Sequence, residues 1–255
     1  MMEKTALRAH AVRLRDAGRL FRRGDTELED IFQGSIDRFC DIALALDGAH
    51  RVLDVGAGHG LLLSFLAELG HECHALDVVD QPAAHPEIYG KGIRFHLCNV
   101  EADLIPYADD SFDAVVCCQV LEHFTHSHLP SVRDMRRVLR PGGVLEIDVP
   151  NVACFRNRLR LLRGKHITYD YADHYLRAAP ILYQGRSYYP LRHNREFTRE
   201  ELDLLLKMAG FDKRHVVFLK SRRYREGLQR LRSVGTAVKD LVPSFRKSLI
   251  AFAYK

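Results

Sequence analysis

Apolar residues recur at helical spacing among charged residues in two segments near the N-terminus, residues 5–23 and 27–46. A period near 3.6 residues places these apolar side chains on one face of a helix. The pattern therefore predicts two amphipathic helices that come before the first strand and pack on the rest of the domain.

Short apolar runs and helical segments then alternate along the chain. Strands are predicted at residues 51–56, 72–78, 93–100, 112–121 and 143–151. A helix is predicted over residues 61–70, with Gly70 in the C-cap position, and another from about Pro130 to Leu139, where "RPGG" ends it. Strands that are apolar almost throughout and alternate with helices are typical of a parallel sheet covered on both faces. The predicted fold class is α/β, a Rossmann-like doubly wound sheet.

The regular pattern fails between residues 151 and 194, a segment that holds six of the ten tyrosines. It is too long for an ordinary turn between sheet elements, so we interpret it as an inserted cap after the fifth strand. Regularity returns with "TREELDLLLKMAG", a predicted helix with Thr198 as N-cap and Glu201 at the capping-box position. Two further strands are predicted at residues 215–220 and 248–255.

These elements divide the chain into four parts. Its 255 residues, of which 47% are hydrophobic, are enough to bury a substantial core. We assign 1–48 to N-terminal helices, 49–150 to the Rossmann-like core, 151–195 to the inserted cap and 196–255 to the C-terminal part of the core with a basic amphipathic segment.

Charge and cysteine content narrow the class of protein. The formal net charge of the chain is +5. The segment from Lys220 to Lys247 has nine Lys or Arg and two acids, a charge of +7, so the rest of the chain sums to −2. The six cysteines contain no CxxC pair, so neither a disulfide framework nor a zinc site is expected. In "HECH", residues 71–74, the His and Cys side chains point different ways, and no metal site is expected there either.

The chain has no apolar run long enough for a signal peptide or a membrane span. We therefore predict a cytoplasmic protein.

The stretch "RVLDVGAGHG" places Gly56, Gly58 and Gly60 directly behind a predicted strand. Glycines allow the backbone to turn sharply and allow a ligand to approach main-chain atoms. In an open α/β sheet this loop lies at the carboxyl end of a central strand, where ligands bind. The dinucleotide motif GxGxxG would place its third glycine one residue later, at Leu61, which disfavours a nicotinamide-dependent oxidoreductase.

An acidic residue closes the second predicted strand at a spacing typical of nucleotide-binding units. Asp77 stands 23 positions after Asp54, close to the separation at which an acid meets ribose hydroxyls. A carboxylate there accepts hydrogen bonds from both hydroxyls of an unphosphorylated ribose and repels a 2′-phosphate. The glycines and this acid together indicate a nucleoside-binding site.

Four blocks between residues 50 and 151 resemble class I S-adenosylmethionine-dependent methyltransferases of the type 11 and type 23 kind: "VLDVGAGHG", the acid Asp77, "DDSFDAVV...VLEH" and "LRPGGVLEIDVPN". The later "REFTREELDLLLKMAGF" also resembles this superfamily. The resemblance implies a seven-stranded sheet in which strand seven is antiparallel and lies between strands five and six. It further implies S-adenosylmethionine as cofactor and an enzyme that transfers its methyl group.

The resemblance implies cofactor-binding roles for nine residues. The glycines would surround the methionine moiety together with Gln119, while the acid after strand two would hold the ribose. Many relatives carry Asp at the position of Asn99, but the amide oxygen of Asn accepts the same hydrogen bond from adenine. The nine residues are Asp54, which positions the loop, and Gly56, Gly58, Gly60, Asp77, Val78, Asn99, Val100 and Gln119.

His123, in "LEHF" beyond the fourth strand, is the candidate general base, because histidine titrates near neutral pH and this strand end faces the cofactor. The alternative is that His123 packs against the following helix. Aromatic stacking and Arg contact with an anionic group suggest further residues in or beside the cap as substrate contacts. These candidates are Tyr169, Tyr171, His174, His193 and Arg195.

The expected acceptor is an oxygen or nitrogen atom on a small molecule, a saccharide or a lipid-linked substrate. The basic segment from Lys220 to Lys247 has apolar residues at steps of three or four, so it either packs on its own domain or lies on an anionic membrane as a peripheral contact. Nucleic acid is not the expected partner, because no aromatic residues are interleaved there as a stacking platform. An RNA methyltransferase, a binding module that holds S-adenosylmethionine without chemistry, and an NAD-dependent oxidoreductase stay open as alternatives.

Overall fold

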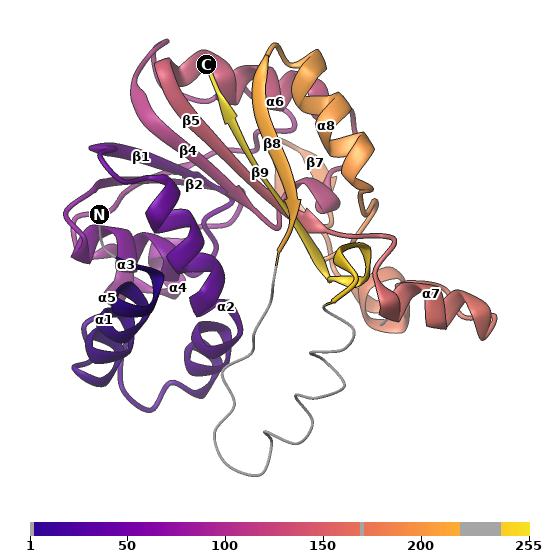
Figure 1. Ribbon diagram of the computed structural model, residues 1–255, viewed down its shortest axis with the longest axis horizontal. Helices are drawn as coiled ribbons and strands as arrows, with labels where there is room; N and C mark the ends of the chain where they lie inside the picture. Colours follow the sequence, from indigo (N-terminus) through magenta and orange to yellow (C-terminus); the bar gives the residue numbers. More distant parts are fainter. Residues whose placement is uncertain (1–2, 169–170, 220–240) are drawn as a thin grey trace.

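The computed structural model describes residues 3–168, 171–219 and 241–255. One seven-stranded sheet, with strand order β3-β2-β1-β4-β5-β9-β8, runs through the molecule (Figure 1). Its strands are β1 (Arg51–Val55), β2 (Glu72–Asp77), β3 (Arg94–Leu97), β4 (Phe112–Cys118), β5 (Leu139–Pro150), β8 (Lys213–Phe218) and β9 (Ser248–Tyr254). The first five strands are parallel, whereas β9 is antiparallel to both of its neighbours. The predicted sheet is confirmed, including the place of its seventh strand.

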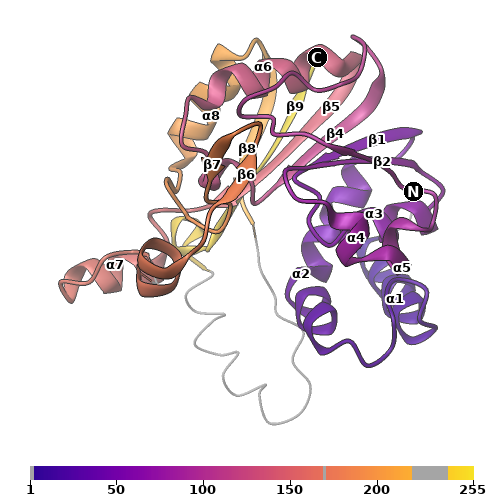
Figure 2. The same ribbon diagram turned by 180° about the vertical axis from the view of Figure 1, so that it is seen from behind.

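Helices cover both faces of this sheet. In Figures 1 and 2 the N-terminal helices α1, α2 and α3 gather with α4 and α5 on one side, and α6 and α8 lie on the other. The helices are α1 (Lys4–Asp16), α2 (Thr26–Ala45), α3 (Leu61–Glu68), α4 (Gln81–Ala84), α5 (Pro86–Tyr89), α6 (His128–Val138), α7 (Phe155–Leu162) and α8 (Arg199–Met208).

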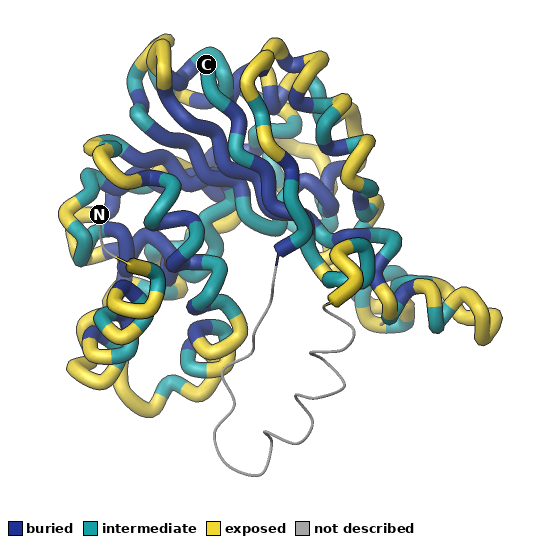
Figure 3. The backbone as a smooth tube through the Cα atoms, in the orientation of Figure 1, coloured by how far each residue is buried: buried dark blue, intermediate teal, exposed yellow. Residues whose placement is uncertain are grey.

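The core consists of two buried apolar clusters, one on each face of the sheet. Val52 of β1 packs in the cluster beneath α1, α2 and α3, and its neighbour Leu53 packs in the cluster beneath α6 and α8. Successive side chains of a strand point to opposite faces, so a strand that is apolar at every position serves both clusters. Figure 3 shows these strands as buried along most of their length.

Local signals set several boundaries of the helices. Asp25 caps α2 by accepting a hydrogen bond from the main-chain N–H of Leu28 at 3.0 Å, and the predicted capping box of Thr198 and Glu201 is present at the start of α8. The first helix was predicted to reach residue 23 but ends at Asp16, shortly before Gly18 turns the chain at φ 70°.

The "RPGG" stretch differs from its predicted role. It was expected to separate a helix from the fifth strand, but β5 already begins at Leu139 and includes it. A register shift between Phe112 and Ala114 of β4 accommodates the extra residues, with Gly142 at φ 78°. A β-bulge of this kind absorbs additional residues in one strand without ending the pairing.

The segment between β5 and α8 contains ordered elements of its own. It holds α7, a π-helical turn η2 (Ala172–Arg177), and a hairpin of β6 (Ile181–Tyr183) and β7 (Arg186–Tyr188). Helix α7 extends away from the sheet in Figures 1 and 2. The predicted basic amphipathic helix falls mainly on residues 220–240, outside the described ranges, as does Tyr169. Among the described helices, none combines the length and apolar character needed to cross a bilayer.

Candidate active site

The glycine-rich loop leaves β1 and enters α3 with its three glycines in left-handed backbone conformations, at φ 73°, 51° and 73°. Residues with a side chain seldom adopt such angles. A Cβ on Gly56 would overlap Cγ2 of Val120, and a Cβ on Gly60 would lie 3.0 Å from Ile88. A Cβ on Gly58 would meet no described atom within 4 Å, so the main chain there borders open space. The first and third glycines serve close packing, and the second leaves room for a ligand.

Asp77, at the end of β2, binds the glycine-rich loop directly. Its Oδ2 accepts a hydrogen bond from the main-chain N–H of Gly58 at 2.9 Å, and its Oδ1 accepts one from the N–H of Val79 at 2.9 Å. A carboxylate has about four lone-pair sites, so both oxygens retain the capacity to accept from ribose hydroxyls. Tyr89 fixes the other side of Gly58 by donating its hydroxyl to the carbonyl oxygen at 2.7 Å.

Asp54 lies buried in β1, and its Oδ1 has no hydrogen-bond partner among the described residues. Burial, and then the neighbouring charge of Asp77, raise the pKa of Asp54 to about 7, against the opposing effect of Arg38. An orphaned buried carboxylate oxygen of this kind calls for a partner that the protein itself does not supply.

The predicted adenine contacts follow β3. Asn99 is buried, and its Oδ1 accepts a hydrogen bond from the main-chain N–H of Glu101 at 3.1 Å. The carbonyl oxygen of Val100 accepts from the Ser131 hydroxyl at 2.7 Å, while Val78 lies half-buried beside Asp77. The side-chain amide oxygen of Asn99 therefore uses one lone pair for the main-chain N–H of Glu101. Its second lone pair can accept the predicted hydrogen bond from the adenine amino group.

Gln119 ends β4 in a left-handed conformation, at φ 55°, which is uncommon for a residue with a side chain. Two hydrogen bonds to Asp148 of β5 hold it there. Its main-chain N–H donates to the carbonyl oxygen of Asp148 at 2.8 Å, and its side-chain amide donates to the carboxylate. This turn points the end of Gln119 toward a cavity.

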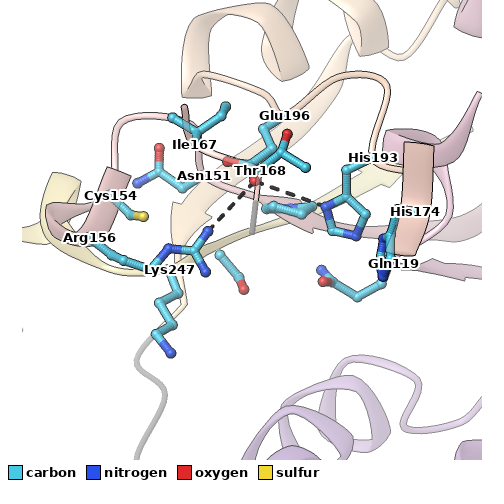
Figure 4. Close-up of a pocket in the computed structure, with 12 residues that line it drawn as sticks. Gln119, Asn151, Cys154, Arg156, Ile167, Thr168, His174, His193, Glu196 and Lys247 are labelled. Atoms are coloured by element: carbon cyan, nitrogen blue, oxygen red, sulfur yellow. Dashed lines mark ion pairs between the residues drawn. The ribbon is translucent and has the colours of Figure 1, made fainter. Parts of the chain in front are cut away.

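That cavity, of about 260 Å³, lies between the carboxyl ends of β4 and β5 and the inserted segment (Figure 4). Glu196 lies 3.9 Å from Arg156 and 4.0 Å from Nδ1 of His193, and these ion pairs are the dashed lines in Figure 4. The lining residues come from strand ends, the insertion and the start of β9: Gln119, Pro150, Asn151, Cys154, Arg156, Ile167, Thr168, His174, His193, Glu196, Lys247 and Ser248.

The predicted substrate residues separate into two groups. His174 and His193 line the cavity, and their role as substrate contacts stays a prediction. Tyr171 is 63% exposed and stacks on Tyr175, and Arg195 forms an ion pair with Glu201 of α8, so neither is among the lining residues.

Sequence reasoning missed Asn151, whose side-chain amide donates to the carbonyl oxygens of Ser244 and Arg246 at 3.0 and 2.8 Å. It also missed Glu196, which accepts from the side chain of Asn157 at 2.6 Å. The "VPN" ending of β5 was a signal for Asn151, because a polar residue directly after a buried strand stands at the edge where ligands bind.

His123 lies in the 3₁₀ turn η1 (Leu121–His123) beyond β4. Its Nδ1 is 3.0 Å from the carbonyl oxygen of Arg192, and its ring packs edge-on against that of His193. Burial, and then the charge of His193, lower the pKa of His123 to about 4. The imidazole is therefore neutral at pH 7 and accepts a proton less readily than an ordinary histidine.

Comparison with known proteins matches the central part of the chain to a family model. Residues 53–147 match the family model described as methyltransferase domain. This match supports the resemblance of these residues to class I S-adenosylmethionine-dependent methyltransferases. The sheet order and the glycine-rich loop agree with that resemblance.

Sequence similarity to individual proteins covers less than half of the chain, whereas structural similarity covers most of it. Ubiquinone biosynthesis O-methyltransferase of Xanthomonas oryzae pv. oryzae is 37% identical over 112 residues, which are 42% of this chain and 46% of that protein. The chain thus matches less than half the length of that curated relative.

Two solved structures share the fold across most of their length. An S-adenosylmethionine-dependent methyltransferase of Mesorhizobium loti has a TM-score of 0.57 at 16% identity, over 87% of this chain and 98% of that one. The Burkholderia thailandensis 1,6-didemethyltoxoflavin-N1-methyltransferase, solved with S-adenosylhomocysteine, has a TM-score of 0.52 at 22% identity, over 98% of this chain and 87% of that one.

The residues present fit S-adenosylmethionine. The open space at Gly58 accommodates a ligand against the main chain, and the unpartnered Oδ1 of Asp54 is a carboxylate oxygen that an ammonium group satisfies. Asp77 stands beside both with remaining acceptor capacity for a ribose. The match to a methyltransferase domain implies the same cofactor.

Proposed function

We propose that this protein transfers a methyl group from S-adenosylmethionine to an oxygen or nitrogen atom of a small molecule held in the cavity beside Gln119. The observation that carries the proposal is the position of Gln119. It is the residue predicted to flank the methionine moiety, and it also lines the cavity. The cofactor site and the acceptor site therefore meet at one side chain.

The cofactor supplies an activated methyl group on a sulfonium. The contribution of the protein is to hold the acceptor atom in line with that methyl carbon, at a distance of roughly 3 to 3.5 Å. The new bond joins the acceptor to the methyl carbon, the sulfur–carbon bond breaks, and an acceptor hydroxyl or amine releases its proton. His174 lines the cavity and is better placed to receive that proton than His123, the base predicted from the sequence.

The size and lining of the cavity favour a compact acceptor. Its volume of about 260 Å³ lies just below the ~300–1,000 Å³ of typical ligand pockets. Arg156, Lys247 and two histidines line it together with one acid, Glu196. This set suits a phenol, a sugar hydroxyl or a small molecule with an anionic group.

Helix α7 supports a second element of the proposal, peripheral contact with an anionic membrane. Its apolar side chains Phe155, Leu161 and Leu162 are 42%, 59% and 85% exposed, and its eight residues include three arginines and no acid. Exposed apolar and basic side chains on one helix are typical of interfacial binding. The protein would then bind a lipid-linked acceptor at the membrane surface that contains it.

Methyl-labelled S-adenosylmethionine incubated with the purified protein and fractionated cell extract tests the proposal. We expect label to enter a low-molecular-weight fraction and Gln119→Ala to reduce that transfer. Label in an RNA fraction would support the RNA methyltransferase alternative instead. Tight binding of S-adenosylhomocysteine by calorimetry, with no label transferred to any fraction, would support the non-catalytic binding module.

A further inference from the structure

Three side chains from distant parts of the sequence meet beside the cavity. Glu122 and His123 follow β4 in η1, whereas His193 comes from the end of the inserted segment. One side-chain ligand atom from each lies within 4.8 Å of the other two. The rings of His123 and His193 are 4.9 Å apart and nearly perpendicular, at 86°.

The carboxylate of Glu122 is the unexplained group in this cluster. The residue is fully buried, and neither of its carboxylate oxygens has a hydrogen-bond partner in the described part of the chain. Burying a polar group without a partner is costly, so two orphaned oxygens on one side chain call for a ligand. The main chain of Glu122 is well anchored, because its carbonyl oxygen accepts from the N–H of Asn194 at 2.7 Å and of Arg195 at 3.2 Å.

Both histidines present a nitrogen suited to a cation. The Nδ1 of His123 is 3.0 Å from the carbonyl oxygen of Arg192. A carbonyl only accepts, so Nδ1 carries the proton and the lone pair is on Nε2. In His193 the Glu196 carboxylate lies 4.0 Å from Nδ1, which leaves Nε2 on the other side of the ring. Outer partners of this kind, a backbone carbonyl and a carboxylate, orient metal-binding histidines in proteins.

We propose that Glu122, His123 and His193 bind one divalent transition-metal cation, with Zn²⁺ as the representative ion. Two imidazoles and one carboxylate are an established ligand set for zinc with an open fourth position. His193 lines the cavity, so the open position faces the proposed acceptor. An acceptor oxygen bound there would be polarised. That last role rests on the proposed function, whereas binding of the cation does not.

No metal site was predicted here from the sequence, because 70 positions separate His123 from His193 and no short motif joins them. Ligand atoms around zinc, at about 2.0–2.2 Å from the ion, lie closer to one another than 4.8 Å. Binding therefore draws the three side chains closer together and ties the inserted segment to the end of β4.

Titration of metal-stripped protein with Zn²⁺ by calorimetry, and with Co²⁺ by absorption spectroscopy, tests the site. We expect one Zn²⁺ per chain and the visible absorption band of tetrahedral Co²⁺. His193→Ala and Glu122→Gln should each weaken Zn²⁺ binding by more than ~100-fold, beyond the effect typical of losing an outer partner. His85→Ala is the matched control, since His85 forms a similar edge-on pair with His59, at 5.1 Å, and should leave Zn²⁺ binding unchanged.

Two results would overturn the site: wild-type protein that binds no Zn²⁺, or a His193→Ala variant that binds it as tightly as wild type. Calorimetry with S-adenosylhomocysteine on the same samples shows whether each variant is folded. The side chain of His193 is 38% exposed, so its removal tests the site even where Glu122→Gln does not fold. Zn²⁺ binding without methyl transfer would support the metal site and refute the proposed function. Methyl transfer without Zn²⁺ binding would refute the metal site and leave the proposed function standing.

Discussion

The side-chain amide of Gln119 and its main-chain N–H both donate hydrogen bonds to Asp148, one to the carboxylate and one to the carbonyl oxygen. The same carboxylate lies 3.6 Å from the Arg38 guanidinium of α2. Arg38 of the N-terminal helices therefore contacts, through Asp148, the network that holds Gln119 at the cavity.

Arg38→Met should destabilise the protein strongly. Its guanidinium faces the buried carboxylates of Asp148, Glu146 and Glu122, and removing one partner of a buried pair typically costs ~3–5 kcal/mol. Arg38 is partly exposed, so we expect about 3 kcal/mol, measured by urea denaturation. Asp148→Asn in the Arg38→Met background should restore part of this loss. Strict additivity of the two substitutions would show that they do not act as a pair.

Gly56→Ala should abolish binding of S-adenosylhomocysteine, because the added methyl group overlaps Val120 where the loop leaves β1. Val120→Ala in the same chain should recover part of that binding. Gly48→Ala is the matched control: Gly48 also has positive φ, at 83°, but a Cβ there meets no described atom within 4 Å. Calorimetry measures the affinities, and equal losses in both glycine variants would refute the steric explanation.

Asp54 should make the protein less stable as the pH rises. Its pKa is raised from 3.8 to about 7 in the folded state, so between these values the folded protein binds more protons than the unfolded chain. The free energy of unfolding then falls with increasing pH, by up to about 4 kcal/mol in total. Asp54→Asn should remove this dependence. Urea denaturation of both proteins near pH 5 and near pH 8 measures it, and parallel profiles would contradict the assignment.

Leu161→Ser with Leu162→Ser should weaken binding to vesicles that contain anionic lipid. These side chains are the most exposed apolar groups of α7, and burial in a lipid interface removes them from water at ~25 cal/mol per Å² of apolar area. Vesicle cosedimentation measures the loss, and thermal unfolding should be unchanged. Leu204→Ser, at a 55% exposed position on α8, is the control. Equal binding of all variants to the vesicles would show that α7 does not contact the membrane.

Features that depend on neighbouring residues in sequence were predictable. The glycines after β1, the acid after β2, and the pair of Thr198 and Glu201 each reflect a local rule of backbone geometry or hydrogen bonding, and the structure contains each of them. The hairpin of β6 and β7 was missed, although Gln184 and Gly185 form a two-residue turn with positive φ, at 49° and 76°. Its strands have three residues each, too few for the alternation of side chains to be recognised.

Features that depend on distant contacts were not predictable. The approach of Arg38 to Asp148 spans 110 positions, and Glu196 meets Asn157 across 39. No period or spacing in a single sequence encodes such pairs, because they arise when helices dock on the sheet. The cavity is of this kind as well, since its lining is drawn from four separate segments.

The antiparallel strand β9 occupies an interior place in the sheet, between β5 and β8. While the protein is being synthesised, the ribosome has to release residues 248–254 before that place is filled. Until then β5 presents an unpaired apolar edge, which invites association with other chains. Slower translation between β5 and β9 would prolong this exposure, so the arrangement makes the yield of native protein sensitive to chaperones that shield nascent strands.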